Sequence, residues 1–217
     1  MTLVGIAVVA LMGSGSLHAR VIQSVRADLD RDGRMETVAI TRTGAVDGHP
    51  TGGDTVVMRG EKVLWRQACL NPWKVTTGDV DGDGKPEIIA GVWKKSPRDP
   101  VMAKRTFVYS WNGRRMLPKW LGSRLSRRFD DFVVADINGD RMAELISLEL
   151  APEGKRRVSV YRWFSFGFEF LGCSEDMAGL RSLRVESHDV TVIGRNERYA
   201  LSLSNGCVTL AKGGHAR

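Results

Sequence analysis

The sequence has few cysteines, few histidines and, beyond its first residues, no long hydrophobic run. Its three cysteines, Cys69, Cys173 and Cys207, show no CxxC spacing, so we predict neither a zinc site nor a disulfide framework. At most one bridge can form among them, and free, partly buried thiols are the preferred interpretation. No segment after residue 19 approaches the ~20 apolar residues that a membrane span requires. The sequence also lacks a nucleophile elbow and a phosphate-binding loop, which would indicate an enzyme.

Residues 1–19 have the pattern of a secretory signal peptide. An apolar stretch at residues 3–12 is followed by small residues and by Ala19, a suitable cleavage position. No Lys or Arg precedes this stretch and Leu17 is bulky, so an uncleaved anchor or a mis-assigned start is the alternative. We expect a secreted or cell-surface protein whose residues 20–217 form a single domain, because 42% hydrophobic and 26% charged residues are typical of globular chains.

Acidic loops of one spacing are the most informative feature of the chain. Residues 79–87 place Asp79, Asp81 and Asp83 at loop positions 1, 3 and 5, and Glu87 at position 9. Carboxylate oxygens at these positions can converge on one hard cation, while the glycine at position 6 permits a sharp turn. An EF-hand closes with a glutamate at position 12 and is flanked by helices, whereas an apolar, strand-like run follows this loop. The pattern therefore predicts a calcium site between two strands.

The same loop occurs twice more, which gives a first (28–36), a second (79–87) and a third (136–144) acidic loop. Their starts are 51 and 57 residues apart, a spacing typical of blade or solenoid repeats. A solvated Asp/Gly turn is the alternative for any single copy. The additional candidate ligands are Asp28, Asp30, Asp32, Glu36, Asp136, Asn138, Asp140 and Glu144.

Apolar segments on both sides of the loops predict four units of four strands each. The expected strands are 21–27, 37–41, 55–58 and 63–65; 74–77, 87–93, 106–111 and 114–117 across an Asn112-Gly113 turn; 132–135, 144–150, 157–163 and 166–171; and 182–186, 189–193, 199–204 and 207–212. The fourth unit is degenerate, because the short turn Ser187-His188-Asp189 replaces the acidic loop; we expect no metal there and assign His188 as a turn residue. Small sheets must bury their faces against neighbours, so we predict an all-β, four-bladed β-propeller with blades at about 20–70, 71–122, 129–172 and 180–213.

The D-x-D-x-D-G-x-x-E loops, each followed by a branched apolar strand, resemble the FG-GAP/VCBS repeats of integrin alpha-subunit propellers and of many secreted bacterial proteins. The chain after residue 19 looks like a small secreted bacterial member of that class. The resemblance implies two to three structural Ca²⁺ sites, with the position-7 backbone carbonyls of Arg34, Lys85 and Met142 as further ligands. The third loop departs from the pattern at Arg141 in position 6 and at Asn138, which weakens it. An all-oxygen ligand set without histidine indicates a structural ion rather than a catalytic zinc.

The charge balance indicates anionic partners. The chain carries a net charge of +7 although 11 of its 25 acidic residues lie in the loops, which leaves 14 against 32 Lys and Arg. The rest of the surface is therefore strongly cationic and suits a cell-wall polymer, an acidic glycan, a phospholipid surface or a protein better than nucleic acid. The alternative is a basic surface that only confers solubility.

Blade topology places all acidic loops on one rim and collects aromatic and cationic residues on the opposite rim. Indole rings can stack on sugars, and Lys or Arg can pair with carboxylate or phosphate groups. The alternative is that the tryptophans pack in the core and the basic residues form a solvated rim. The candidate ligand-binding residues are Trp73, Trp93, Lys94, Lys95, Arg98, Lys104, Trp120, Arg124, Arg127 and Arg128.

These features together predict a calcium-binding, non-enzymatic binding or scaffold module, with no catalytic residues. A secreted hydrolase or lyase that acts on a glycan or a phosphodiester is the alternative, because propellers also support enzymes. Asp130, Asp131 and His49 supply titratable groups for it, but their spacing does not indicate a particular chemistry.

Overall fold

The computed structural model describes residues 20–42, 44–46, 48–96, 99–122, 125–186 and 189–213. The predicted signal peptide, the candidate ligand residues Arg98 and Arg124, and the turn residues Ser187 and His188 lie outside these ranges. The described chain is all-β apart from one short 3-10 helix, Pro152–Gly154. It contains no helix of the length and apolar character needed to cross a membrane.

Four four-stranded antiparallel sheets make up the fold, and each keeps its strands in sequence order, which confirms the predicted units. The strands are β1 (Arg20–Ala27), β2 (Glu36–Arg42), β5 (Thr55–Arg59) and β6 (Lys62–Gln67); β7 (Pro72–Gly78), β8 (Glu87–Ser96), β9 (Asp99–Trp111) and β10 (Met116–Leu121); β11 (Phe129–Ala135), β12 (Glu144–Leu150), β13 (Arg156–Phe164) and β14 (Gly167–Cys173); and β15 (Ser182–Glu186), β16 (Asp189–Ile193), β17 (Arg198–Ser204) and β18 (Cys207–Lys212).

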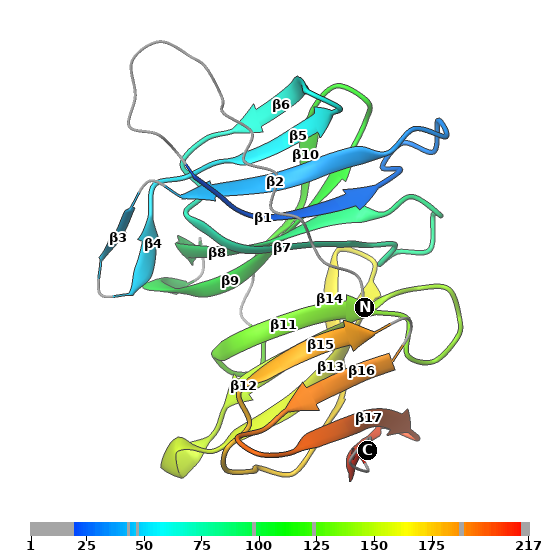
Figure 1. Cartoon of the computed structure of the whole chain (residues 1–217). Helices are drawn as coiled ribbons and strands as arrows, with labels where there is room; N and C mark the ends of the chain where they lie inside the picture. Colours follow the sequence, from blue (N-terminus) through cyan, green and yellow to red (C-terminus); the bar gives the residue numbers. More distant parts are fainter. Residues whose placement is uncertain are drawn as a thin grey trace.

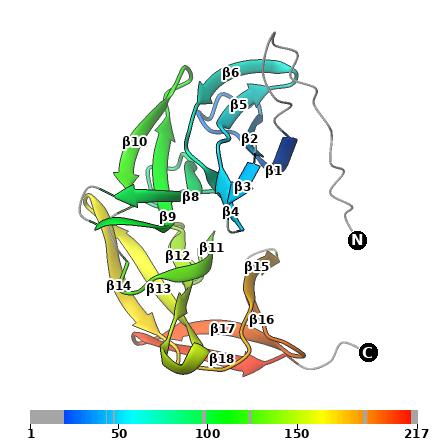
Figure 2. The ribbon, with the colours of Figure 1, turned by 90° about the vertical axis from the view of Figure 1, so that its left-hand side faces the viewer.

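The sheets follow one another round an arc in a propeller-like arrangement (Figures 1 and 2). The first strands lie innermost, because β1 contacts β7, β7 contacts β11 and β11 contacts β15. Among the described residues, the extensive contacts between sheets join only consecutive sheets.

Both faces of the second and third sheets are buried, because each lies between two other sheets; this explains their continuous apolar runs. In β8, Ile88 packs in a cluster shared with the first sheet, and Ile89 packs in a cluster shared with the third. In β12, Leu145 faces the second sheet and Ile146 faces the fourth. Successive strand residues point to opposite faces, so the adjacent pairs supply two separate cores.

The repeat extends to irregularities in the strands. The first strands of the first three sheets each hold one extra residue, Ile22, Trp73 and Asp130, at the same register position. The fourth strands of these sheets also have a register shift, whereas β15–β16 and β17–β18 pair without interruption. Bulges increase local twist and re-aim side chains. The fourth sheet has therefore lost both bulges together with the acidic loop.

Two local predictions were wrong. No strand was predicted between residues 41 and 55, but a hairpin of β3 (Gly44–Val46) and β4 (His49–Thr51) lies there, and the His49 ring stacks on Trp93 with centroids 3.5 Å apart. The β9–β10 turn is longer than the predicted Asn-Gly turn, and β10 begins at Met116. The reason is that Asn112 Oδ1 accepts the backbone N–H groups of Arg114 and Arg115, at 3.1 and 2.9 Å, which lengthens the turn.

Candidate metal-binding loops

The three acidic loops lie on one rim of the molecule, on the right in Figure 1, and each joins the first and second strands of its sheet. Neighbouring loops touch. The Ala143 N–H of the third loop donates to the Asp79 carbonyl of the second at 2.7 Å. The Arg31 guanidinium of the first loop lies against Gly84 of the second. The loops therefore form one continuous acidic rim, as the blade topology predicts.

The aspartate at position 1 folds each loop. In the second loop, Asp79 accepts the N–H groups of Gly82 and Gly84 at 2.8 and 2.7 Å. Asp136 accepts the N–H groups of the same two positions, 4 and 6, in the third loop, and Asp28 accepts those of positions 5 and 6 in the first. A short carboxylate that binds its own backbone stabilises a tight turn, so this side chain shapes the loop by itself.

Each loop holds positions 4 and 6 in the left-handed backbone region. The second loop has glycine at both, Gly82 with φ 74° and Gly84 with φ 87°. The third has Arg141 at position 6 with φ 72°, so the departure visible in the sequence is present as backbone strain. The first has Arg31 at position 4 with φ 58°, which was not predicted because the loop pattern requires glycine only at position 6. Glycine at position 4 of the other two loops is the signal that would have revealed it.

The glutamate at position 9 is buried in all three loops, and its exposed fraction is 0–1%. It is the first residue of the second strand, at the end of the core. One carboxylate oxygen of Glu36, Glu87 and Glu144 accepts the N–H group of loop position 2, at 3.0, 3.1 and 3.0 Å respectively. The other oxygen contacts a different N–H donor in each loop.

In the first loop that partner is Arg59, at the end of β5. Its Nε lies 2.7 Å from Glu36 Oε1, and its Nη2 lies 3.1 Å from Asp32 and 3.6 Å from Asp30. The contact joins residues 23 positions apart. Arg59 lies outside the loop motif, and the motif does not indicate this contact, so sequence reasoning missed the residue.

In the second loop the partner is Lys119 of β10, whose Nζ lies 2.9 Å from Glu87 Oε1 and forms a close ion pair with Asp81. Burial lowers the pKa of Lys119, but the hydrogen bonds to Asp81 and Glu87 outweigh it, and the pKa lies above its ordinary value. Burial raises the pKa of Glu87, although the Lys119 ammonium and the Val80 N–H act in the opposite direction. Sequence reasoning also missed Lys119.

In the third loop the partner is an amide. Asn138 Nδ2 lies 2.9 Å from Glu144 Oε1 and 3.0 Å from Asp140 Oδ2. Burial raises the pKa of Glu144 to about 7; the carboxylates of Asp140 and Asp136 contribute to this shift, and the Ile137 N–H opposes it. An amide satisfies hydrogen bonds but carries no charge, so the electrostatic repulsion in this loop persists.

The donor sets of the first two loops fit a hard cation. Carboxylate oxygens of Asp28, Asp30 and Asp32 lie within 4.8 Å of one another, and so do those of Asp79, Asp81 and Glu87. In the first loop, Asp30 Oδ1 is also buried without a hydrogen-bond partner. Among the described residues of the third loop no three carboxylates converge in this way.

The remaining ligand assignments stay predictions. Asp83 accepts the Lys85 N–H at 2.7 Å, and the N–H groups of Arg34 and Met142 make the equivalent bonds in the other loops. These bonds fix the loop backbone at position 7, whose carbonyls are the expected further ligands.

Protein groups already contact the candidate tryptophans, and Trp120, level with Ile89 and next to Lys119, lies near the acidic loops and not on the opposite rim as predicted. Trp120 is buried edge-on against Phe168, with ring centroids 5.2 Å apart. Trp73 packs against Phe132 at 5.6 Å, and Lys104 lies over its ring at 4.7 Å. Trp93 is stacked on His49 of the β3–β4 hairpin. Trp120 is therefore a core residue, whereas Trp73 and Trp93 are half-buried and their ligand role stays a prediction.

The cationic candidates differ in exposure and in whether they contact another group of the protein. Lys104 Nζ donates to the Asp130 carbonyl at 2.6 Å, and Arg127 lies 3.6 Å from Asp176. Lys95 and Arg128 are exposed. Lys94 is half-buried. A ligand role for the cationic residues stays a prediction.

The acids proposed for the enzyme alternative are engaged in ion pairs. Asp130 pairs with Arg156 at 2.6 Å, and Asp131 pairs with Lys74 at 2.6 Å. Asp131 also accepts the Leu183 N–H at 2.8 Å, so its two oxygens link the second, third and fourth sheets. Both acids therefore have a structural role, because they connect strands and sheets. The three cysteines are free thiols, as predicted, but only Cys173 is partly buried; Cys69 and Cys207 are exposed, contrary to the prediction.

Comparison with known proteins gives a match on the second acidic loop. No curated protein matches the chain significantly. The matched segment comprises β7, the second loop and the first part of β8, and this is the loop with glycine at both left-handed positions. Residues 71–92 match the model of the FG-GAP repeat.

Proposed function

We propose that the protein is a secreted or cell-surface binding module, not an enzyme, whose first and second acidic loops bind Ca²⁺ as a structural ion. The observation that carries this proposal is the convergence of three carboxylates in each of these loops. The buried, unpartnered Asp30 Oδ1 adds a second indication in the first loop. Hard oxygen donors at a strand connection suit Ca²⁺, and the FG-GAP match at residues 71–92 supports a propeller-type binding module.

Calcium would act here by charge neutralisation. The first loop would hold it with Asp28, Asp30, Asp32 and Glu36, the second with Asp79, Asp81, Asp83 and Glu87. The third loop is the weakest, because Asn138 lowers its charge and Arg141 strains it. Extracellular calcium modules bind with dissociation constants of about 0.1–1 mM, so such loops fill outside a cell.

Thermal unfolding in EDTA and in 10 mM CaCl₂ tests the calcium assignment. A site with that affinity stabilises the folded protein by about 1.4–2.7 kcal/mol at ~10–100 times its dissociation constant. The Asp81→Ala, Asp83→Ala variant is expected to lose part of the shift. Glu153→Ala, which removes an exposed carboxylate outside the loops, serves as the matched control. The same midpoint with and without calcium, together with no heat of binding in calorimetry, would refute the assignment.

The proposed partner is an anionic polymer, a glycan or an acidic protein surface. Support comes from the cationic balance outside the loops and from exposed Lys95 and Arg128 on the rim opposite the loops. Retention on immobilised heparin, an anionic polymer, in 0.15 M NaCl measures this binding. We expect Lys95→Glu, Arg128→Glu to elute earlier. Lys62→Glu, Arg114→Glu, which makes the same change in net charge at the β5–β6 and β9–β10 turns on the loop rim, should elute near the unchanged protein. Equal loss in both variants would show that net charge alone is responsible.

A further inference from the structure

One atom, Oε1 of the position-9 glutamate, meets an N–H donor of the chain itself in every loop. The donors are the Arg59 guanidinium in the first loop, the Lys119 ammonium in the second and the Asn138 amide in the third. Two of the three are therefore full positive charges placed among carboxylates that would bind a metal. The Lys119 side chain is only 21% exposed, so it packs against the loop and does not extend into solvent.

The two cations come from different places in the repeat. Met58 and Tyr161 pair with the residues that follow Glu36 and Glu144, so the position after them is Arg59 in the first sheet and Arg162 in the third. Lys119 occupies the bulge of the fourth strand, where the third sheet has Leu171. A cation reaches the same carboxylate from two unrelated positions. Inheritance of a single repeat residue does not explain this.

The third sheet provides a contrast within the same molecule. Arg162, the counterpart of Arg59, bonds Glu169 at 2.7 and 2.8 Å and is exposed, and it does not pair with Glu144. A cavity of about 260 Å³ lies beside the third loop, and Asp140, Glu144 and Arg162 line it. An arginine at this position can therefore pair outside the loop, which makes the placement of Arg59 a specific feature of the first loop.

An internal cation and a bound metal exclude each other. Calcium needs carboxylate oxygens at about 2.3–2.6 Å, and Arg59 Nη2 already lies 3.1 Å from Asp32 and 3.6 Å from Asp30, two residues of the converging set. In the second loop, Lys119 contacts Asp81 and Glu87, two of the three converging residues. Like charges at such distances repel strongly, so the side chain must leave before a divalent ion enters.

We infer that Arg59 and Lys119 are built-in counter-cations that take the place of the metal in the first and second loops. They keep these loops neutralised and folded without calcium, and calcium binds only by releasing the side chain. The competition part of this inference rests on the proposed calcium binding; the neutralisation part does not. The result is a module whose loops respond to calcium at higher concentrations than the carboxylates alone would set.

Lys119→Met tests the inference, because Met keeps the apolar stem and removes the charge. We expect this variant to be less stable than the unchanged protein in EDTA, since it leaves the buried Glu87 carboxylate unpaired. In calorimetry it is expected to bind Ca²⁺ about tenfold more tightly, because no side chain has to be displaced. Arg59→Met should behave alike at the first loop. Arg162→Met, which removes an exposed cation from the same rim, is the control, and Lys119→Arg should keep the original calcium affinity.

The two proposals fail in different ways. If no variant binds calcium up to 10 mM, the proposed function is wrong, but loss of stability in EDTA for Lys119→Met and not for Arg162→Met still supports the counter-cation. If Lys119→Met matches Arg162→Met in EDTA, the counter-cation inference is overturned. It is also overturned if Lys119→Arg binds calcium as tightly as Lys119→Met. Should Lys119→Met fold only in calcium, the metal has replaced the missing charge and the inference is supported.

Discussion

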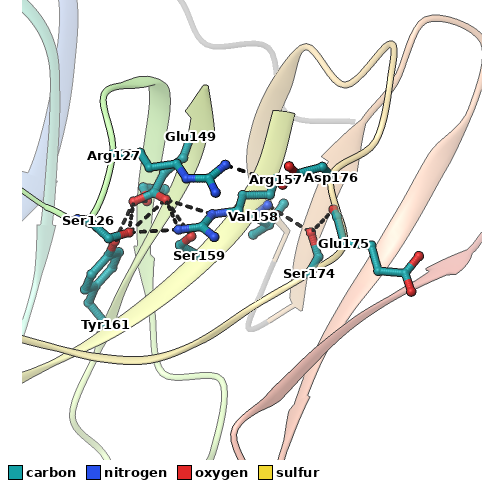
Figure 3. A network of polar contacts seen from close by, with 11 residues as sticks. Ser126, Arg127, Glu149, Arg157, Val158, Ser159, Tyr161, Ser174, Glu175 and Asp176 are labelled. Carbon is teal, nitrogen blue, oxygen red and sulfur yellow. Dashed lines mark hydrogen bonds and ion pairs between the residues drawn. The ribbon is translucent and has the colours of Figure 1, made fainter. Parts of the chain in front are cut away.

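Replacing Arg157 by methionine should strongly destabilise the fold, because it strands a buried carboxylate. Figure 3 shows the arrangement: Arg157 of β13 points at Glu149 of β12, which is fully buried. The Nε and Nη2 atoms of Arg157 donate to Glu149 Oε2 at 3.1 and 3.0 Å. The hydroxyl groups of Ser126, Ser159 and Tyr161 also donate to this carboxylate.

The magnitude follows from what the substitution leaves behind. Removing one partner of a buried ion pair costs about 3–5 kcal/mol, because the remaining charge stays buried. These three hydroxyl donors and a fourth, Ser147 at 3.4 Å, still contact the Glu149 carboxylate after the change, so we take the lower end, about 3 kcal/mol. In a protein of this size that free energy lowers the melting temperature by roughly 6–12 °C.

Urea unfolding followed by tryptophan fluorescence measures the effect. Arg162→Met is the matched control, since it breaks the exposed Arg162–Glu169 pair and should change the free energy of unfolding by at most about 0.5 kcal/mol. The double variant Glu149→Leu, Arg157→Met removes the stranded charge and should recover part of the loss. A loss below about 1 kcal/mol for Arg157→Met, or one equal to that of the control, would refute the reasoning.

Two further predictions concern the acidic loops. Because burial raises the pKa of Glu144 to about 7, the folded protein keeps a proton that the unfolded chain releases near pH 4.5. The free energy of unfolding in EDTA should therefore fall by roughly 3 kcal/mol as the pH rises from 4.5 through 7, and urea titrations of Glu144→Gln should lack this component. Gly84→Ala places a side chain at φ 87° and should lose about 1 kcal/mol, whereas Arg141→Gly relieves φ 72° and should gain about 0.5 kcal/mol. Thermal melts that show no difference in sign between these two variants would contradict the strain that we assign to the loops.

The fold was largely predictable because its signals are local. The adjacent residues Ile88 and Ile89 already indicate a strand with two buried faces, and the structure places them in two different cores. The three loops share one spacing, so their position on a common rim follows from strand order alone. The four-sheet architecture therefore needed no information from distant parts of the chain.

What the sequence could not reveal depends on contacts between distant residues. Arg59 and Lys119 reach loops 23 and 32 residues away, and nothing in the loop motif specifies which basic residue does so. The stacking of His49 on Trp93 likewise joins the β3–β4 hairpin to β8. In the sequence, Trp120 cannot be told apart from a tryptophan on which a sugar would stack. In the structure, its register position in β10 directs the side chain into the core. Burial, not residue type, separates the two roles.

The position-9 glutamate connects the loop to the fold, and this explains which loop positions vary between repeats. Position 3 changes to Asn138 and position 6 to Arg141, yet glutamate stands at position 9 in all three loops. Its backbone begins the second strand, its carboxylate binds the N–H of position 2, and the residues after it enter the cores on either side. A residue there without a side-chain acceptor would leave that N–H unpaired at the end of the core, whether or not a metal is bound. In the fourth sheet Glu186 pairs directly with Asp189; with no acidic loop to close, no buried carboxylate is needed.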